Sequence, residues 1–188
     1  MKHYNEEDLY RYEKNYKSWK IKLKYLLFVP GFQYSFCFRN AQNASNSISR
    51  FFWIGMLRIM MYHSGFQIPW NTKIGPGIRF SHWGTVIVNP NSVIGKNFTI
   101  SAGCTIGSAQ GKRKGYPTLG DNVIMQTNSV VVGNVKIGND VLIAPSAFVN
   151  FDVPDNCIVI GNPGKIIQRE TSPTNAYIDR KIEEMGII

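Results

Sequence analysis

Residues 88–106 read Val-Asn-Pro-Asn-Ser-Val-Ile-Gly-Lys-Asn-Phe-Thr-Ile-Ser-Ala-Gly-Cys-Thr-Ile, with an aliphatic residue every six positions. The same spacing runs through two further series: Ile68, Ile74 and Phe80, and Leu119, Met125, Val131, Ile137, Ile143 and Val149. A period of six is neither the helical period, near 3.6, nor the alternation of a plain strand. It is typical of a β-solenoid whose coils each send the apolar residue inward. An ordinary β-sandwich with regular turns is the alternative, and thirteen in-register positions disfavour it.

The six-residue register breaks twice. Phe80 and Val88 are eight residues apart, so two residues are extra around His82. Ile106 and Leu119 are thirteen residues apart, which leaves seven extra residues within 108–117. Insertions in a solenoid leave the coil as loops, often on the binding face.

Composition bounds the class of protein. The 188 residues suit one domain with appendages, and an apolar share of 44% is ample for a packed core. The net charge is +9, and residues 1–66 supply most of it, with ten Lys or Arg against four Asp or Glu. Nucleic acid, an anionic membrane surface and anionic ligands are possible partners for such a chain. We expect no nucleic acid, because no recognised nucleic-acid motif is present.

Cysteine and histidine usage excludes further classes. The three cysteines are widely spaced, without a CxxC pair, and no signal peptide is evident. These features predict a reducing cytoplasm and disfavour a disulfide framework or a zinc site. Two of the three histidines lie outside the repeat, so we expect no trihistidine metal site of the γ-carbonic anhydrase kind.

The flanks predict three parts: a helical N-terminal cap (1–66), the coils (67–167), and a C-terminal tail (168–188) with a helix over 173–186. Within the cap, Ile48 to Tyr62 predicts a helix that is too short and too charged to span a membrane. The helices of the cap can cover the open edge of the first coil, as solenoids require. The basic and aromatic composition also suits peripheral contact with a membrane surface, and the two roles are compatible.

Candidate chemistry lies at the two breaks. His82 is the only histidine in the coils, and a neutral imidazole can take a proton from a hydroxyl. A corner histidine that hydrogen-bonds a carbonyl is the structural alternative. Lys112, Arg113 and Lys114 suit phosphate binding, and a solvated loop explains them equally well. Cys104 reads as a small buried residue.

The order of short motifs narrows the family. They are Thr72-Lys73-Ile74-Gly75, Ser81-His82, Val93-Ile94-Gly95-Lys96-Asn97, Gly103-Cys104-Thr105-Ile106-Gly107, Pro117-Thr118-Leu119-Gly120-Asp121-Asn122-Val123 and Gly161-Asn162-Pro163-Gly164-Lys165. The stretch 68–167, over half of the chain, resembles the hexapeptide-repeat acyltransferases on their serine acetyltransferase branch. The resemblance implies a mainly β fold, a left-handed parallel β-helix.

The resemblance also implies a homotrimer with active sites between neighbouring prisms, acetyl-CoA as donor, no metal, and His82 as general base. A backbone N–H is expected to stabilise the oxyanion, and no acyl-enzyme cysteine is implied. The cofactor residues that it implies are Gly107, Lys112, Thr127, Ala144, Pro145 and Lys165, with Arg169 also toward the phosphates.

Three departures bear on the acceptor. Gln67, Ser81 and the pair Gly115-Tyr116 stand where serine acetyltransferases have Asp, Asp and Arg-His. Losing those charges leaves the ammonium and carboxylate of serine unpaired. The Pro30-Gly31-Phe32 front, the Ile68–Gly75 entry and the Gly111–Gly115 loop resemble polysaccharide O-acetyltransferases more closely.

The sequence therefore predicts an O-acetyltransferase for a sugar hydroxyl in surface or capsular polysaccharide biosynthesis. We expect Trp83, Tyr116, Gln67 and Asn89 to contact the acceptor, with Asn89 or a backbone carbonyl orienting His82. A serine O-acetyltransferase and an antibiotic acetyltransferase are the alternatives of the same fold, and a catalytically silent scaffold is the alternative of another class.

Overall fold

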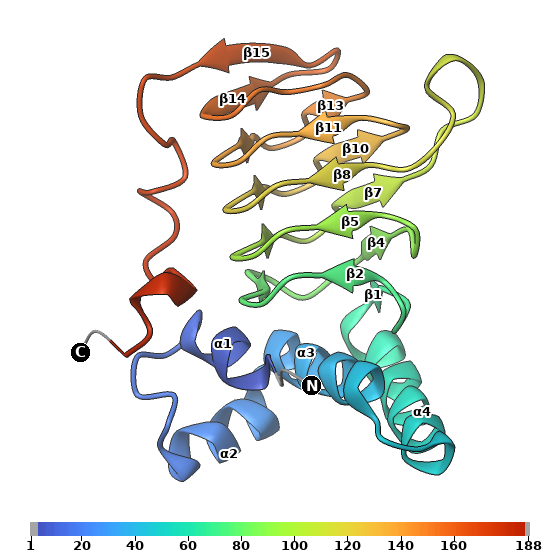
Figure 1. The fold of residues 1–188 in the computed structure, drawn as a ribbon, viewed down its shortest axis with the longest axis vertical. Helices are drawn as coiled ribbons and strands as arrows, with labels where there is room; N and C mark the ends of the chain where they lie inside the picture. Colours follow the sequence, from blue (N-terminus) through green and yellow to red (C-terminus); the bar gives the residue numbers. More distant parts are fainter. Residues whose placement is uncertain (1–3, 187–188) are drawn as a thin grey trace.

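The computed structural model describes residues 4–186, which form a helical cap, a parallel β-helix and a C-terminal segment that returns to the cap (Figure 1). The cap consists of α1 (Asn5–Tyr10), α2 (Trp19–Phe28), α3 (Pro30–Asn43) and α4 (Ser47–Ser64). Among the described residues, no helix is long and apolar enough to cross a membrane. The helix predicted from Ile48 to Tyr62 is confirmed as α4.

The strands form three sheets, and each coil contributes one short strand to each sheet. Sheet A contains β1 (Phe66–Gln67), β4 (Val86–Val88), β7 (Thr105–Gly107), β10 (Val130–Val132) and β13 (Phe148–Val149). Sheet B contains β2 (Lys73–Ile74), β5 (Val93–Ile94), β8 (Thr118–Leu119) and β11 (Lys136–Ile137). Sheet C contains β3 (Arg79–Phe80), β6 (Thr99–Ile100), β9 (Ile124–Met125), β12 (Leu142–Ile143), β14 (Cys157–Ile160) and β15 (Lys165–Gln168).

The six-residue period explains this stacking. Three faces of six residues make a coil of eighteen, so Val131 pairs in parallel with Val149, eighteen residues further on. Phe80, Ile100 and Met125 likewise follow one another up sheet C. These residues are almost completely buried and form one continuous core. The predicted β-solenoid is confirmed.

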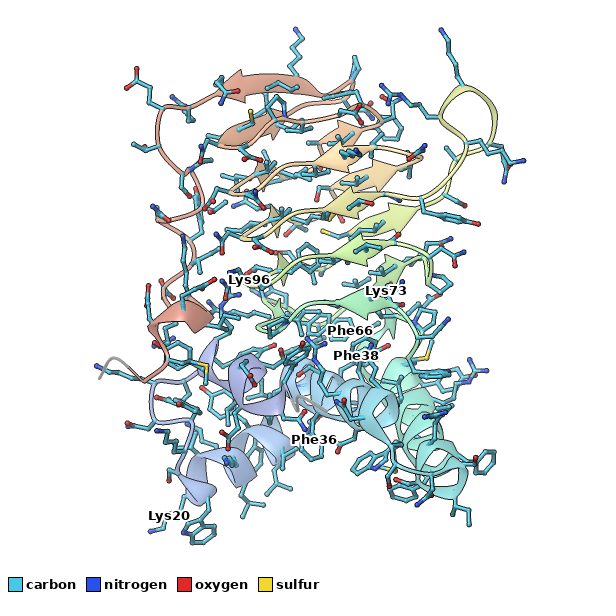
Figure 2. The ribbon with its side chains drawn as sticks, in the orientation of Figure 1. Lys20, Phe36, Phe38, Phe66, Lys73 and Lys96 are labelled. Carbon is cyan, nitrogen blue, oxygen red and sulfur yellow. The ribbon has the colours of Figure 1, made fainter. Side chains whose placement is uncertain are left out.

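The cap is held to the first coil by a buried ion pair. Arg39 on α3 donates to Asp8 on α1 over 2.8 Å, and neither side chain is exposed. Arg39 also donates to the carbonyls of Ile74 and Gly75, while Asp8 accepts from the amides of Gly77 and Ile78. The pair therefore satisfies backbone groups at the open edge of the solenoid, where Phe38 of the cap and Phe66 of the first coil belong to one core (Figure 2).

The C-terminal segment corrects one prediction. After the antiparallel β14–β15 hairpin, the chain runs back along sheet C and places Ile178 on Ile124 and Leu142 (Figure 1). The helix predicted over 173–186 is wrong: turns lead only to the 3₁₀ turn η2 (Ile182–Glu184). The segment bonds to itself only in isolated turns, such as that from Ile178 to the Thr174 carbonyl, and other polar groups bond to the coils. Thr174 donates to Asp140, and the amide of Ile182 donates to Asn97.

We predict that Asp8→Ala lowers the free energy of unfolding by about 3–5 kcal/mol, because it leaves a buried guanidinium without its counter-charge. The matched control is Glu6→Gln, which breaks the exposed pair of Glu6 with Lys22 (2.6 Å) and costs less than about 1 kcal/mol. Urea unfolding measures both. Similar losses in the two variants would contradict the role given to the buried pair.

Candidate functional site

His82 lies in the turn 81–85, which connects β3 of sheet C to β4 of sheet A. The turn leaves the coil because two residues are extra, and both His82 and Trp83 are exposed. Gly84 has a φ of +134°, and a Cβ built on it would lie 3.1 Å from the Cβ of Ala102 in the next coil. A glycine therefore lets the turn lie close above its neighbour while the imidazole and indole point outward.

A pocket of about 330 Å³ lies between this turn and the cap. It is lined by Tyr12, Tyr25, Phe28, Val29, Pro30, Gly31, Arg79, Phe80, Ser81, His82 and Trp83. The coil thus supplies the imidazole and the cap supplies an aromatic wall. Of the four residues expected to contact the acceptor, only Trp83 lines this pocket.

Arg79 supplies a positive charge to the pocket, and Tyr12 packs beside it. Arg79 is an outward residue of β3, and its guanidinium lies 5.9 Å from the centre of the Tyr12 ring and 3.7 Å from Asp179. Its Nε is buried and has no hydrogen-bond partner among the described residues. The Tyr12 hydroxyl accepts from the Phe80 amide over 2.8 Å, and burial raises the pKa of Tyr12. The pocket therefore presents a cation beside the imidazole.

Asn89 and Gln67 lie away from this pocket. Asn89 follows β4, which places about 10 Å of strand between it and the His82 turn. Its side-chain oxygen accepts from the Asn91 amide over 3.0 Å. Gln67 is exposed on β1, the edge strand of sheet A next to the cap. Within residues 4–186 the His82 imidazole makes no hydrogen bond. The single chain therefore shows no group that orients the imidazole.

Three of the residues implied for the cofactor lie on the same edge of the prism as His82. The turns 81–85, 101–104, 126–129 and 144–147 all connect sheet C to sheet A; we call this line of turns the C–A edge. Thr127, Ala144 and Pro145 are in the third and fourth of these turns. Amides join the turns, since Asn128 donates to Ala102 and Ser146 donates to Thr127. At about 4.8 Å a coil, the fourth turn is about 14 Å from the first.

Lys165 begins β15 directly above this edge. The amide of Gly164 donates to the Phe148 carbonyl over 3.0 Å, which fixes the turn 161–164 on the last coil. The Lys165 side chain is exposed. A line from His82 along the C–A edge therefore ends near a cation.

Gly107, Lys112 and Tyr116 lie on the opposite edge of sheet A. The loop 108–117 leaves the prism between β7 and β8 and protrudes from it (Figure 1). Two backbone hydrogen bonds of 3.2 Å between Ala109 and Gly115 close its base. Arg113 in the 3₁₀ turn η1 (Gly111–Arg113) pairs with Asp152 at 3.3 Å, whereas Lys112 is exposed. One chain does not bring this loop to its own His82.

Sequence reasoning missed Arg79 and Tyr12. A signal for Arg79 existed, because it precedes Phe80 and must therefore point out of the coil beside the break. No local signal could find Tyr12, whose contact with Phe80 spans 68 residues.

No protein-family model matches the chain. The serine acetyltransferase of Helicobacter pylori is 31% identical over 153 residues, which are 79% of this chain and 88% of that protein. The serine acetyltransferase of Synechococcus elongatus is 32% identical over 159 residues, 78% of this chain and 61% of the relative. A solved structure of Neisseria gonorrhoeae serine acetyltransferase in complex with serine has a TM-score of 0.69 and 26% identity, covering 86% of this chain and 66% of that one.

These likenesses confirm the resemblance to the serine acetyltransferase branch and the left-handed β-helix fold. The chain spans 61% of the length of the Synechococcus relative and 54% of one from Staphylococcus epidermidis.

The predicted sugar acceptor and the role in polysaccharide biosynthesis are wrong, because the relatives are serine acetyltransferases. The findings favour the alternative acceptor, L-serine. The prediction failed because serine acetyltransferases have Asp, Arg and His at positions where this chain does not. We took their absence to mean that the pocket has no charged group for the acceptor. The structure places another cation, Arg79, in the pocket with His82.

The three thiols do not form part of this site. Cys37, Cys104 and Cys157 are buried and unpaired, and burial raises the pKa of the Cys37 thiol to about 11. Burial also raises the pKa of Cys104 and of Cys157.

We predict that none of the three thiols reacts with Ellman's reagent in the folded protein at about pH 8, because neither thiolate nor access is available. All three should react in denaturant, which is the control for the reagent. Rapid modification of the native protein would show an accessible thiol and reopen a covalent mechanism.

Proposed function

Since the chain belongs to the serine acetyltransferase family, we propose that it transfers the acetyl group of acetyl-CoA to the hydroxyl of L-serine. The observation that carries the proposal is the exposed His82, in a pocket with Arg79, on one line with the turns of the C–A edge. The Helicobacter relative, matched over 88% of its length, supports the same activity.

In this reaction His82 acts as general base. Its neutral imidazole takes the hydroxyl proton while the serine oxygen attacks the thioester carbonyl. The new C–O bond forms as the C–S bond breaks, and the imidazolium returns its proton to the leaving thiolate. The protein must also stabilise the oxyanion, for which backbone amides of the exposed turn are the donors at hand.

The C–A edge is the proposed track of the donor. Its turns expose backbone and small side chains at Thr127, Ala144 and Pro145, against which a narrow pantetheine arm can lie. Lys165, exposed at the far end of this edge, suits the phosphates of CoA. Arg169, which the resemblance also implies for the phosphates, lies at the other end of β15, where its amide donates to the Asn156 carbonyl. The order of groups along the edge is then base, arm and phosphates.

A homotrimer would complete the site. Lys112 and Tyr116 lie across sheet A from His82 of their own chain, so a neighbouring copy has to bring them to it. Sheet A supports such contact, because its outward residues Ile87, Val130 and Phe148 are apolar and partly exposed. Gly107 and Gln67 lie on the same face. The cytoplasm remains the predicted compartment, and contact with a membrane depends on the cap rather than on this pocket.

We assign the carboxylate of the acceptor to Arg79. Its only counter-charge among the described residues is Asp179, whose side chain is 63% exposed, at 3.7 Å. Its Nε is buried without a hydrogen-bond partner among the described residues, and the side chain lines the pocket of about 330 Å³. A guanidinium offers a carboxylate two parallel hydrogen bonds, which replace those that the family's Arg would make at Gly115.

We predict that His82→Ala lowers kcat for L-serine by about 10²–10⁴-fold, because it removes the general base. Thiol release from acetyl-CoA measures the rate. The control is CoA binding: CoA should raise the melting temperature of both proteins, since a ligand of the native state stabilises it. Turnover unchanged by the substitution would discard the mechanism, and no thermal shift in the wild type would favour a silent scaffold.

We predict that Arg79→Gln raises the KM for L-serine roughly 10- to 100-fold, the cost of a lost charged hydrogen bond, with a smaller effect on kcat. L-serinamide, which lacks the carboxylate, is the matched control and should lose much less. Arg79→Lys should restore part of the affinity. Equal losses with both acceptors would give Arg79 a structural role only.

A further inference from the structure

The outer face of α4 carries large apolar side chains that are mostly exposed. Ile48 (85%), Phe51 (83%) and Tyr62 (83%) are almost fully exposed, and Phe52 and Ile59 are more than half exposed. Their spacing of three, four and seven residues places them on one side of the helix. The opposite side packs on the core through Trp53, Met56 and Met60. A helix that is apolar on both sides needs a second apolar environment.

The outer face of α2 has the same character. Trp19, Leu23, Leu27 and Phe28 are exposed, and this helix has no buried residue. Lysines stand between them at Lys20, Lys22 and Lys24. Cations that flank exposed aromatic and leucine side chains are typical of helices that lie in a membrane interface.

The two faces lie at the same end of the molecule. Figure 1 shows α2 and α4 at the end of the cap away from the last coil, and Figure 2 shows Lys20 pointing away from the coils there. We call this end the cap face: the exposed apolar residues of α2 and α4 with Lys14, Lys17, Lys20, Lys24 and Arg58. Both apolar stripes therefore belong to the cap, at the end of the molecule away from the last coil.

The charge of this region is of one sign. Residues 14–120 contain fourteen Lys or Arg and no Asp or Glu. The acidic residues near the cap face are Glu6, which Lys22 neutralises at 2.6 Å, Glu13, which precedes Lys14, and Glu184 of the C-terminal segment. The surface therefore offers apolar anchors surrounded by unneutralised cations.

A basic cavity borders the same face. Lys14, Lys17 and Lys20 line a hollow of about 550 Å³ between the start of α2 and Glu184. Tyr10 and Tyr16 form its apolar wall. Three lysines line this hollow against one carboxylate, and the net positive charge suits a phosphate-bearing headgroup rather than a neutral ligand.

We propose that the cap face binds peripherally to an anionic phospholipid bilayer. The aromatic and leucine side chains of α2 and α4 enter the interface, and the lysines contact lipid phosphates. The helices lie along the surface, consistent with the absence of a spanning helix among the described residues. The inference does not depend on the reaction at His82, because no residue of the cap face except Phe28 lines that pocket.

A second copy of the chain is the competing occupant. A symmetric contact between two cap faces would bring the same cations together, and the few carboxylates near them are fewer than the cations. An anionic bilayer satisfies both the apolar and the charged part of the surface. The charge pattern therefore favours lipid.

Flotation with vesicles tests the proposal on the full chain. We expect association with vesicles of phosphatidylcholine and phosphatidylglycerol, weaker association with phosphatidylcholine alone, and release as salt is raised. Lys17→Glu/Lys20→Glu/Lys24→Glu should lower the partition coefficient at least about tenfold. Phe51→Ser/Phe52→Ser should lower it as well, at unchanged melting temperature, because both rings are exposed.

The matched control is Lys112→Glu/Arg113→Glu/Lys114→Glu, which makes the same change of charge on the protruding loop and should keep vesicle binding. No association of the wild type with anionic vesicles would overturn the proposal. An equal loss in the loop variant would reduce it to non-specific charge attraction. A fall in oligomeric mass of the cap variants, with vesicle binding unaltered, would assign the face to a second copy.

Discussion

The buried pair of Asp8 and Arg39 is the interaction on which the arrangement of the cap depends. A solenoid leaves the polar backbone of its first coil unpaired, and these two side chains bond to it at Ile74, Gly75, Gly77 and Ile78. Arg11 adds a bond to the carbonyl of Gly77 over 2.7 Å. Ions in a dry interior are costly unless every donor and acceptor is met, so this contact tolerates little movement of α1 and α3. The same placement brings the start of α3 against the His82 turn and so creates the wall of the pocket.

The coils could be predicted from the sequence because their structure is periodic. Each inward residue packs on the equivalent residue of the next coil. The contact between Ile100 and Met125 can therefore be predicted from the repeat alone. The breaks in that spacing located both the His82 turn and the protruding loop. The cap-to-coil contacts could not be predicted, because Asp8 and Ile78 are seventy residues apart and nothing local links them. The helix predicted in the C-terminal segment was wrong for the same reason. Thr174 and Ile182 bond to Asp140 and Asn97, which are distant in the sequence, and these bonds hold the segment in a non-helical path.

The wrong prediction of the acceptor shows that residues matched by sequence alignment can differ from the residues that line the pocket in space. Gly115-Tyr116 lacks the charged residues that the family has there, and from this the sequence analysis inferred a neutral ligand. A carboxylate, however, needs a guanidinium at the right place and from any strand. Arg79 occupies such a place, on β3, three residues before His82. A substrate should therefore be inferred from missing residues only once the structure of the pocket is known. Another strand or helix can supply the charge, and a sequence alignment does not match that element to the residue that is missing.

The C-terminal segment connects this pocket to the rest of the chain. Asp179 lies 3.7 Å from Arg79, and Glu183 pairs with Lys96 at 2.6 Å one turn further along. The first pair is long and solvent-exposed, so it is worth little and breaks at small cost, whereas the second also includes a hydrogen bond from Asn97 to Glu183. A carboxylate that enters the pocket competes with Asp179 for the same guanidinium. In the proposed reaction, the segment can yield at Asp179 while Glu183 and Ile178 keep it on the coils, so binding of the acceptor to Arg79 would not require the tail to unfold.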